Sequence, residues 1–193
     1  MAAAACVTRF SASAFAESPI NPDLLFVGTD DGNVWMTQDG GANWTDLTEY
    51  FPGLEGKRWV SRIIASRFDE DRAYAAFDGH RSDDFAPHVY MAIDGGKHWV
   101  SIAANLPDDA PVRVIREDVK NPDLLFLGTE FAAYVSFDRG ESWTALKNNL
   151  PVVPVDDIAI HPRENDLIVG THGRSVWIMA DLTPLEQLST TMM

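Results

Sequence analysis

The strongest constraint on this fold is a short motif that occurs three times. It reads small-x-Asp-x-Gly-x-x-Trp, and each copy lies between two apolar runs of strand character. The Asp carboxylate can accept N–H groups of its own turn, and Gly supplies the positive φ that a tight hairpin needs. The copies are TQDGGANW (37–44), AIDGGKHW (92–99) and SFDRGESW (136–143). Since they recur at separations of 55 and 44 residues, the sequence predicts a repeat protein.

A longer repeat surrounds these turns. The segment NPDLLFVGTD (21–30) matches NPDLLFLGTE (121–130) without a gap, and weaker copies lie at 71–78 and 165–172. Each unit divides into short β-rich runs rather than helical periods. Four-stranded units of about 45 residues are typical of β-propeller blades. We therefore expect an all-β fold of about four consecutive four-stranded antiparallel blades, the last of them incomplete.

The expected domain is one partial propeller at 1–188, followed by a tail at 189–193. Its blades are expected at 13–48, 60–103, 112–147 and 155–182. The last unit keeps a turn Asp, Asp181, but lacks the Gly and Trp, and no clear fourth strand follows it. An open arc is favoured over a closed four-bladed ring, in which residues 6–9 would supply the missing strand. An open arc leaves edges unpaired, so the expected partners are the remaining blades of a larger propeller or a second copy.

Composition excludes several classes of function. The net charge of −14 argues against nucleic acid, which needs a clustered basic face. Cys6 is the only cysteine, so neither an internal disulfide nor a thiolate zinc site is expected. No apolar run approaches the ~18 residues of a membrane span, and the five histidines show no paired metal spacing. We expect no metal and no cofactor. The short apolar run at the N-terminus, with its only charge, Arg9, in the middle, is interpreted as part of the fold rather than as a signal peptide.

The turns resemble the Asp-box, or bacterial neuraminidase repeat (BNR), of sialidases, some endoglucanases and sortilin-type receptors. The segments FDGHRSDDF (77–85), PVRVIRED (111–118) and GTHGRSVWI (170–178) are similar to the C-terminal blades of bacterial sortilin-like proteins that are often labelled BNR-repeat glycosyl hydrolases. This resemblance covers nearly all of residues 14–188. It implies an Asp-box propeller belonging to a longer protein, and a secreted or periplasmic location. It says little about activity, because the label largely derives from the repeat itself.

The Asp-box residues are expected to be structural, since a turn that recurs around a ring is a folding device, whereas a catalytic group is needed once. In a propeller the innermost strand of each blade lines a central channel. The Asp turns and the connections between second and third strands lie at opposite faces. The structural set is Asp39, Trp44, Asp94, Trp99, Asp138 and Trp143.

Any ligand site is therefore expected on the face opposite the Asp turns. The binding candidates there are His80, Arg81, Arg113, Arg116, Glu130, His172 and Arg174. Candidates for acid–base chemistry are Asp78, Asp83, Asp84, Asp156 and Asp157. The favoured function is a non-catalytic scaffold that binds protein or glycan. The alternatives are a glycoside hydrolase, which would need two carboxyls at a defined separation, and a fragment without independent function. The sequence identifies neither the ligand nor the number of blades in the working ring.

Overall fold

The computed structural model describes residues 11–147 and 149–188, in which β-strands dominate the regular structure. The strands are β1 (Ala12–Glu17), β2 (Leu25–Thr29), β3 (Val34–Thr37), β4 (Thr45–Asp46), β5 (Trp59–Ala65), β6 (Ala73–Asp78), β7 (His88–Ala92), β8 (Trp99–Ser101), β9 (Val112–Glu117), β10 (Leu125–Thr129), β11 (Ala133–Ser136), β12 (Thr144–Ala145), β13 (Val155–Ile160), β14 (Leu167–Thr171) and β15 (Val176–Met179). The helices are η1 (Thr48–Tyr50), η2 (His80–Ser82) and α1 (Thr183–Glu186). No helix in the described ranges is long and apolar enough to span a membrane.

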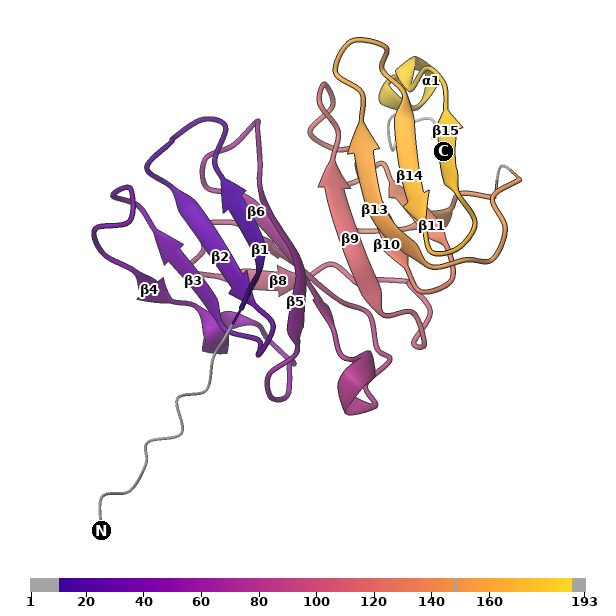
Figure 1. The fold of residues 1–193 in the computed structure, drawn as a ribbon. Coiled ribbons are helices and arrows are strands. Elements are labelled where there is room, and N and C mark those ends of the chain that lie inside the picture. The colour runs from indigo at the N-terminus through magenta and orange to yellow at the C-terminus, as the bar shows by residue number, and fades with distance from the viewer. Residues whose placement is uncertain (1–10, 148, 189–193) are drawn as a thin grey trace.

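The strands form four antiparallel sheets, each built from strands that are consecutive in the chain. Three sheets have four strands, β1–β4, β5–β8 and β9–β12, and the fourth has only β13–β15. Figure 1 shows the sheets following one another from indigo to yellow, with β1, β5, β9 and β13 toward the middle. The predicted all-β propeller fold is confirmed, including the incomplete last blade. The segment 6–9, which was considered for a closing strand, and the tail at 189–193 lie outside the described residues.

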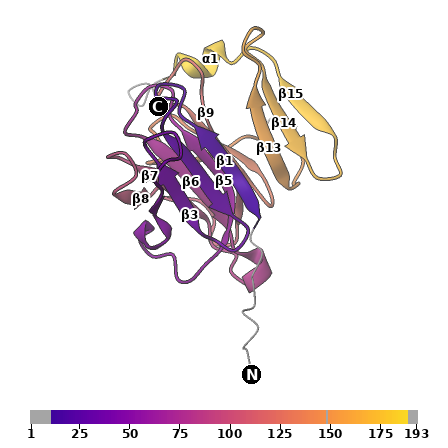
Figure 2. The same ribbon diagram turned by 60° about the vertical axis from the view of Figure 1, so that its left-hand side comes forward.

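Successive blades pack face to face, and the innermost strands β1, β5, β9 and β13 lie side by side in chain order. The separation of the last blade from the first is visible when the molecule is turned (Figure 2). In the second and third sheets, one face packs against the preceding blade and the other against the following blade. Ile63 of β5, for example, shares a buried cluster with Phe26 of the first blade, whereas Tyr74 of β6 packs toward the third blade with Ile115.

Glycines in the second strands allow this close approach. A Cβ on Gly28 would lie 2.3 Å from the Val60 side chain, and one on Gly128 would lie 2.6 Å from Val155. Each glycine therefore makes room for the innermost strand of the following blade. In the last blade a Cβ on Gly170 would meet only Asp157 of its own sheet, at 3.5 Å or more.

The first blade has an exposed apolar face. Phe15, Val27 and Trp35 lie in one row across β1, β2 and β3, and Phe15 is 60% exposed. The equivalent row of the third blade begins with Ile115 and Leu127, which are fully buried against the second blade. The row of the first blade therefore lacks, among the described residues, the blade contact that its counterpart in the third blade makes.

Candidate functional site

The two faces of the propeller differ in chemistry. Neighbouring strands of a blade run in opposite directions. Each innermost strand therefore begins, and each second strand ends, on the same face of the propeller. We call this the loop face and define it by the connections 30–33, 79–87, 130–132 and 172–175. The Asp turns join the third strand to the fourth, and so lie on the opposite face.

The Asp-box carboxylates are engaged within their own turns. Asp39 accepts hydrogen bonds from the N–H of Asn43 at 2.8 Å and from the Thr37 hydroxyl at 2.8 Å. The hydrogen bonds from the Asn43 side chain and backbone and from Thr37 lower the pKa of Asp39 to about 2. Asp138 accepts the N–H of Ser142 at 2.9 Å and the Ser136 hydroxyl at 2.7 Å. This geometry is that of a turn-stabilising residue.

The second Asp turn in the chain, at residues 92–99, has different hydrogen-bond partners. Asp94 accepts the N–H of His98 at 2.6 Å and also contacts its ring Nδ1. The histidine contact is the main cause of the lowered pKa of Asp94. The residue two positions before Asp94 is Ala92, so the hydroxyl present in the other two turns is missing here.

Two of the three Asp-box tryptophans are buried. Trp99 and Trp143 are each 4% exposed; their indole N–H groups donate to Gly96 O at 2.9 Å and Ile102 O at 2.7 Å. Trp44 differs, being 41% exposed although its N–H still donates to Gly41 O. The expectation of core packing therefore does not hold for Trp44, because the described chain has no blade on that side.

Each innermost strand carries a β-bulge near its start, which the sequence reasoning missed. The pairing register shifts around Ser13, Ser61, Arg113 and Asp156, one residue in each blade. Bulges redirect a side chain out of the regular alternation. The first three bulge side chains bond the following innermost strand. Ser13 donates to Val60 O at 2.9 Å and Ser61 donates to Val112 O at 2.8 Å.

The third bulge residue, Arg113, connects the last two blades. Its Nη1 donates to Asp156 Oδ1 at 2.7 Å and its Nε to Glu130 Oε2 at 2.8 Å. Burial alone would lower the pKa of Arg113, but the bond and charge of Glu130, with the charge of Asp156, outweigh it and the pKa is raised. His172 Nδ1 lies 3.3 Å from Asp156 Oδ2. Asp156 thus holds two partners.

Carboxylates within the insertion 78–88 form the hydrogen bonds and ion pairs that position it. Asp84 accepts Arg58 Nε at 2.9 Å and lies 2.7 Å from His88 Nε2. Burial would raise the pKa of Asp84, yet these two bonds lower it. Asp78 is almost fully buried, and its Oδ1 lies 2.7 Å from His80 Nδ1.

Two other candidates in this insertion, Arg81 and Asp83, form no ion pair with any residue that the structure describes. Arg81 stacks over the Trp59 ring at 4.8 Å from the ring centroid, a cation–π contact. Asp83 ends the η2 turn with a φ of 56°.

The Asp157 carboxylate connects three blades. Asp157 of β13 accepts Arg62 Nη2 from β5 at 2.7 Å and contacts Arg116 Nη2 from β9 at 3.5 Å. Arg116 also donates from Nε to Ile158 O at 2.8 Å. Burial, followed by the charge of Arg62, lowers the pKa of Arg116. This network therefore connects the second, third and fourth blades.

A pocket opens among these groups. Its volume is about 340 Å³, and its lining is Trp59, Ser61, Arg62, Asp78, Arg113 and Asp156. Trp59 Nε1 and Arg62 Nε are buried without a hydrogen-bond partner among the described residues. Both atoms belong to residues that line the pocket.

The structure gathers only part of the predicted set in this pocket. It brings together Asp78, Arg113 and Asp156; His80, Glu130 and His172 contact these three but do not line it. Arg174 is exposed, and its backbone carbonyl accepts the Trp177 indole N–H at 2.9 Å. Trp59 and Ser61 were missed. The alignment of residues n and n+100 did not mark them, because Ser13 and Arg113 are only one of several differing pairs between the innermost strands 12–17 and 112–117.

Metal ligation has no support in the part of the chain that the structure describes. No group of three or more His, Cys, Asp or Glu residues there could hold an ion.

The sheets, the three Asp turns and the bulged innermost strands define an Asp-box β-propeller. A family model for Sortilin-Vps10, described as sortilin, neurotensin receptor 3, matches residues 32–150. The chain belongs to this family. A search of curated proteins found no match.

Solved structures with the same fold include glycoside hydrolases and a peptide-bound protein. The GH74 enzyme of Niastella koreensis is 14% identical with a TM-score of 0.67, over 91% of this chain and 29% of that chain. The GH74 xyloglucanase of Xanthomonas campestris is 14% identical with a TM-score of 0.67, over 86% and 28%. YCF48 from Cyanidioschyzon merolae is 16% identical with a TM-score of 0.56, over 90% and 60%. A YCF48 structure bound to D1 peptide also matches. This chain thus spans under a third of the GH74 chains, and the likeness concerns fold alone.

Proposed function

We propose that the chain is a non-catalytic recognition segment of a larger Asp-box propeller and binds glycan or protein on its loop face. The observation that carries this proposal is the polar pocket with its two unpartnered donors, Trp59 Nε1 and Arg62 Nε. A buried donor without a partner costs roughly 1–3 kcal/mol. A ligand hydroxyl or carbonyl oxygen that accepts these bonds therefore regains free energy on binding.

The state of the carboxylates argues against hydrolysis. A hydrolase needs one carboxyl as an acid and another as a base or nucleophile. In this chain Asp84 is bonded by Arg58, Asp156 by Arg113 and Asp157 by Arg62. Burial opposes the change, but the bonds from His88 and Arg58 lower the pKa of Asp84, so this carboxyl is unsuited to act as the acid.

Binding can be tested with xyloglucan oligosaccharides and a library of short peptides as probes. Replacing Trp59 by Ala removes one donor and the aromatic wall, and should weaken binding of the selected probe at least tenfold in calorimetry. Trp44→Ala, on the opposite face, is the matched control and should leave the affinity unchanged. Equal affinity for Trp59→Ala and the parent protein would contradict the pocket assignment.

A second candidate, glycoside hydrolysis, is favoured by the fold shared with GH74 enzymes. In that case Asp78, Asp83, Asp84, Asp156 or Asp157 would supply acid and base. The decisive assay is release of reducing sugar from xyloglucan by the longest available form of the protein. Activity that disappears in Asp78→Asn or Asp156→Asn would establish the hydrolase and reject the scaffold.

The third candidate is a fragment that only completes a larger ring. The exposed row at Phe15 and Trp35 supports a neighbour for the first blade. If the parent protein belongs to a bacterial envelope, as its family resemblance suggests, the ring would be secreted or periplasmic. A monodisperse monomer with one cooperative melting transition would count against the fragment.

A further inference from the structure

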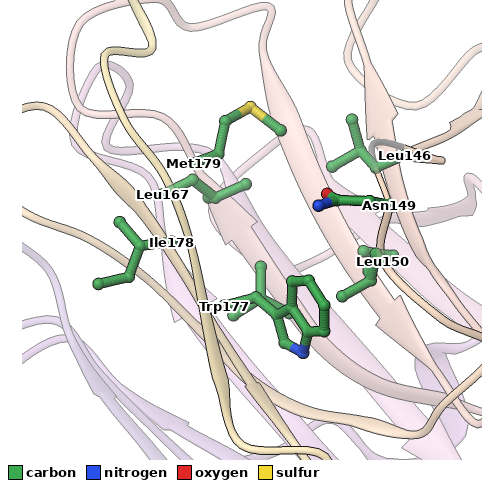
Figure 3. A pocket seen from close by; sticks show the side chains of 9 residues that line it. Leu146, Asn149, Leu150, Leu167, Trp177, Ile178 and Met179 are labelled. Carbon is green, nitrogen blue, oxygen red and sulfur yellow. The ribbon is translucent and has the colours of Figure 1, made fainter.

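A second pocket lies far from the loop-face site, between the last two blades. Its volume is about 170 Å³ and its lining is mainly apolar, with Leu146 and Leu150 on one side and Trp177 and Met179 of β15 on the other (Figure 3). An apolar cavity of ~150 Å³ holds a benzene molecule. The pocket therefore has the size and lining for an aromatic ring.

Filled versions of this pocket occur twice elsewhere in the chain. A segment after each fourth strand repeats as Leu47…Phe51-Pro52, Ile102…Leu106-Pro107 and Leu146…Leu150-Pro151.

At the first copy the ring of Trp99 packs against Phe51, with centroids 4.8 Å apart. At the second copy Trp143 packs with Ile102 and Leu106. In both cases the tryptophan comes from the Asp-box of the following blade. At the third copy the following blade has no fourth strand within residues 149–188, and no described tryptophan fills the same position.

The polar side of the pocket repeats as well. Asn105, which precedes Leu106, donates to Trp143 O at 3.0 Å and accepts the Trp143 N–H at 2.7 Å. Its counterpart before Leu150 is Asn149, which lines the pocket. Figure 3 shows its side-chain amide lying among the apolar groups. The amide is thus placed to bond the backbone of one incoming residue, as Asn105 does.

The backbone beside the pocket also offers an edge with which another strand can pair. Among the strands that the structure describes, β15 pairs with β14 alone. In the preceding blade the equivalent strand β11 pairs on its other side with β12, through Tyr134 to Ala145 and Val135 to Thr144. An edge strand with free N–H and C=O groups accepts an extended peptide by β-augmentation.

We propose that the edge of β15 and the pocket at Leu146 and Leu150 bind one extended strand from a partner polypeptide, and that this strand inserts a tryptophan. The partner chemistry is that of an Asp-box outer strand: tryptophan followed by alternating outward and inward residues. All six tryptophans of this chain, at positions 35, 44, 59, 99, 143 and 177, lie in the described ranges. None of them occupies the pocket except Trp177, which belongs to its wall.

The test uses a synthetic peptide with the sequence of residues 139–147, the strand that fills the equivalent position in the third blade. Titration into the full chain, followed by NMR, should shift signals of β15 and of Asn149. Replacing the peptide tryptophan by alanine should weaken binding at least tenfold. Equal binding of the alanine peptide, or shifts confined to another blade, would overturn the proposal.

Protein variants distinguish peptide binding at the pocket from nonspecific hydrophobic binding. Leu150→Arg should reduce peptide affinity at least tenfold, whereas Val152→Arg, at an 82% exposed side chain outside the pocket, should not. If Leu150→Arg fails to fold, Asn149→Ala tests the same site and should weaken binding severalfold; unchanged affinity in Asn149→Ala would overturn the role of the amide. Concentration-dependent dimerisation that saturates the site and is lost in Trp44→Ala would identify a second copy as the occupant, and so reject a separate partner.

Discussion

At the scale of single residues, the Asp turns show how one carboxylate organises eight residues. Asp39 and Asp138 each bond a hydroxyl two residues before them and the N–H four residues after them. The same hydroxyl accepts an N–H of the turn glycine, at 3.0 Å for Gly41 and 2.7 Å for Gly140. The carboxylate and the hydroxyl therefore act as one unit.

The lowered pKa of Asp39 predicts a pH dependence of stability. An ordinary Asp has a pKa near ~3.9 when unfolded, and the folded value is about 2. The stabilising effect is complete above about pH 4 and is lost as the pH falls toward 2. Asp39→Asn should therefore lower the urea midpoint at pH 6, and its difference from the parent protein should shrink on acidification to pH 3. Asp108→Asn, in an exposed loop, is the control; a difference that grows at low pH would contradict the assignment.

The missing hydroxyl of the second turn predicts a stabilising substitution. Ala92→Ser places a hydroxyl where Thr37 and Ser136 have theirs, next to Asp94 and the Gly96 N–H. The gain expected from such hydrogen bonds is about 1 kcal/mol in the free energy of unfolding, measured by urea denaturation. Ser136→Ala is the reciprocal change and should cost a similar amount. Destabilisation by Ala92→Ser would show that the buried site has no room for the oxygen.

At the scale of elements, the same glycine of the second strand has two environments. Gly28 lies against Val60 of the following blade, whereas Gly170 faces no following blade in the described chain. Gly28→Ala should destabilise by about 1–3 kcal/mol, as overpacking does. Gly170→Ala should be neutral or stabilise by up to about 1 kcal/mol, because alanine restricts the unfolded chain. Thermal melts of both variants test the blade packing; equal losses would contradict it.

At the scale of the whole molecule, the exposed row of the first blade predicts association. The counterparts of Phe15 and Trp35 in the third blade are Ile115, which is fully buried, and Tyr134, which is partly buried against the second blade. Replacing both by serine should reduce concentration-dependent association in sedimentation experiments without lowering the melting temperature. Ile93→Ser, at another exposed apolar side chain, is the control. An unchanged sedimentation profile at all concentrations would mean that this row is not an interface.

The fold was predictable because the residues that define the repeat act on the backbone close to them in the sequence. The Asp turn, the buried run at β10 and the loss of Gly and Trp after Asp181 each act within a few positions of the chain. The candidate site was not predictable in the same way. Trp59 and Ser61 enter the pocket because a bulge shifts the register of β5, and neighbouring residues decide where a bulge forms. The partners of Asp157 come from two other blades, and sequence spacing does not encode that convergence.

The bulges in the four innermost strands have a consequence for how such proteins change over time. A bulge side chain lies outside the alternating pattern that packs one blade on the next. The residues at these sites, Ser13, Ser61, Arg113 and Asp156, differ in size and charge while the backbone around them repeats. Substitutions there alter the lining of the channel one blade at a time and leave the core untouched. A propeller built in this way can acquire new ligand preferences through changes that affect the polar contacts of one blade boundary and not the apolar packing between sheets.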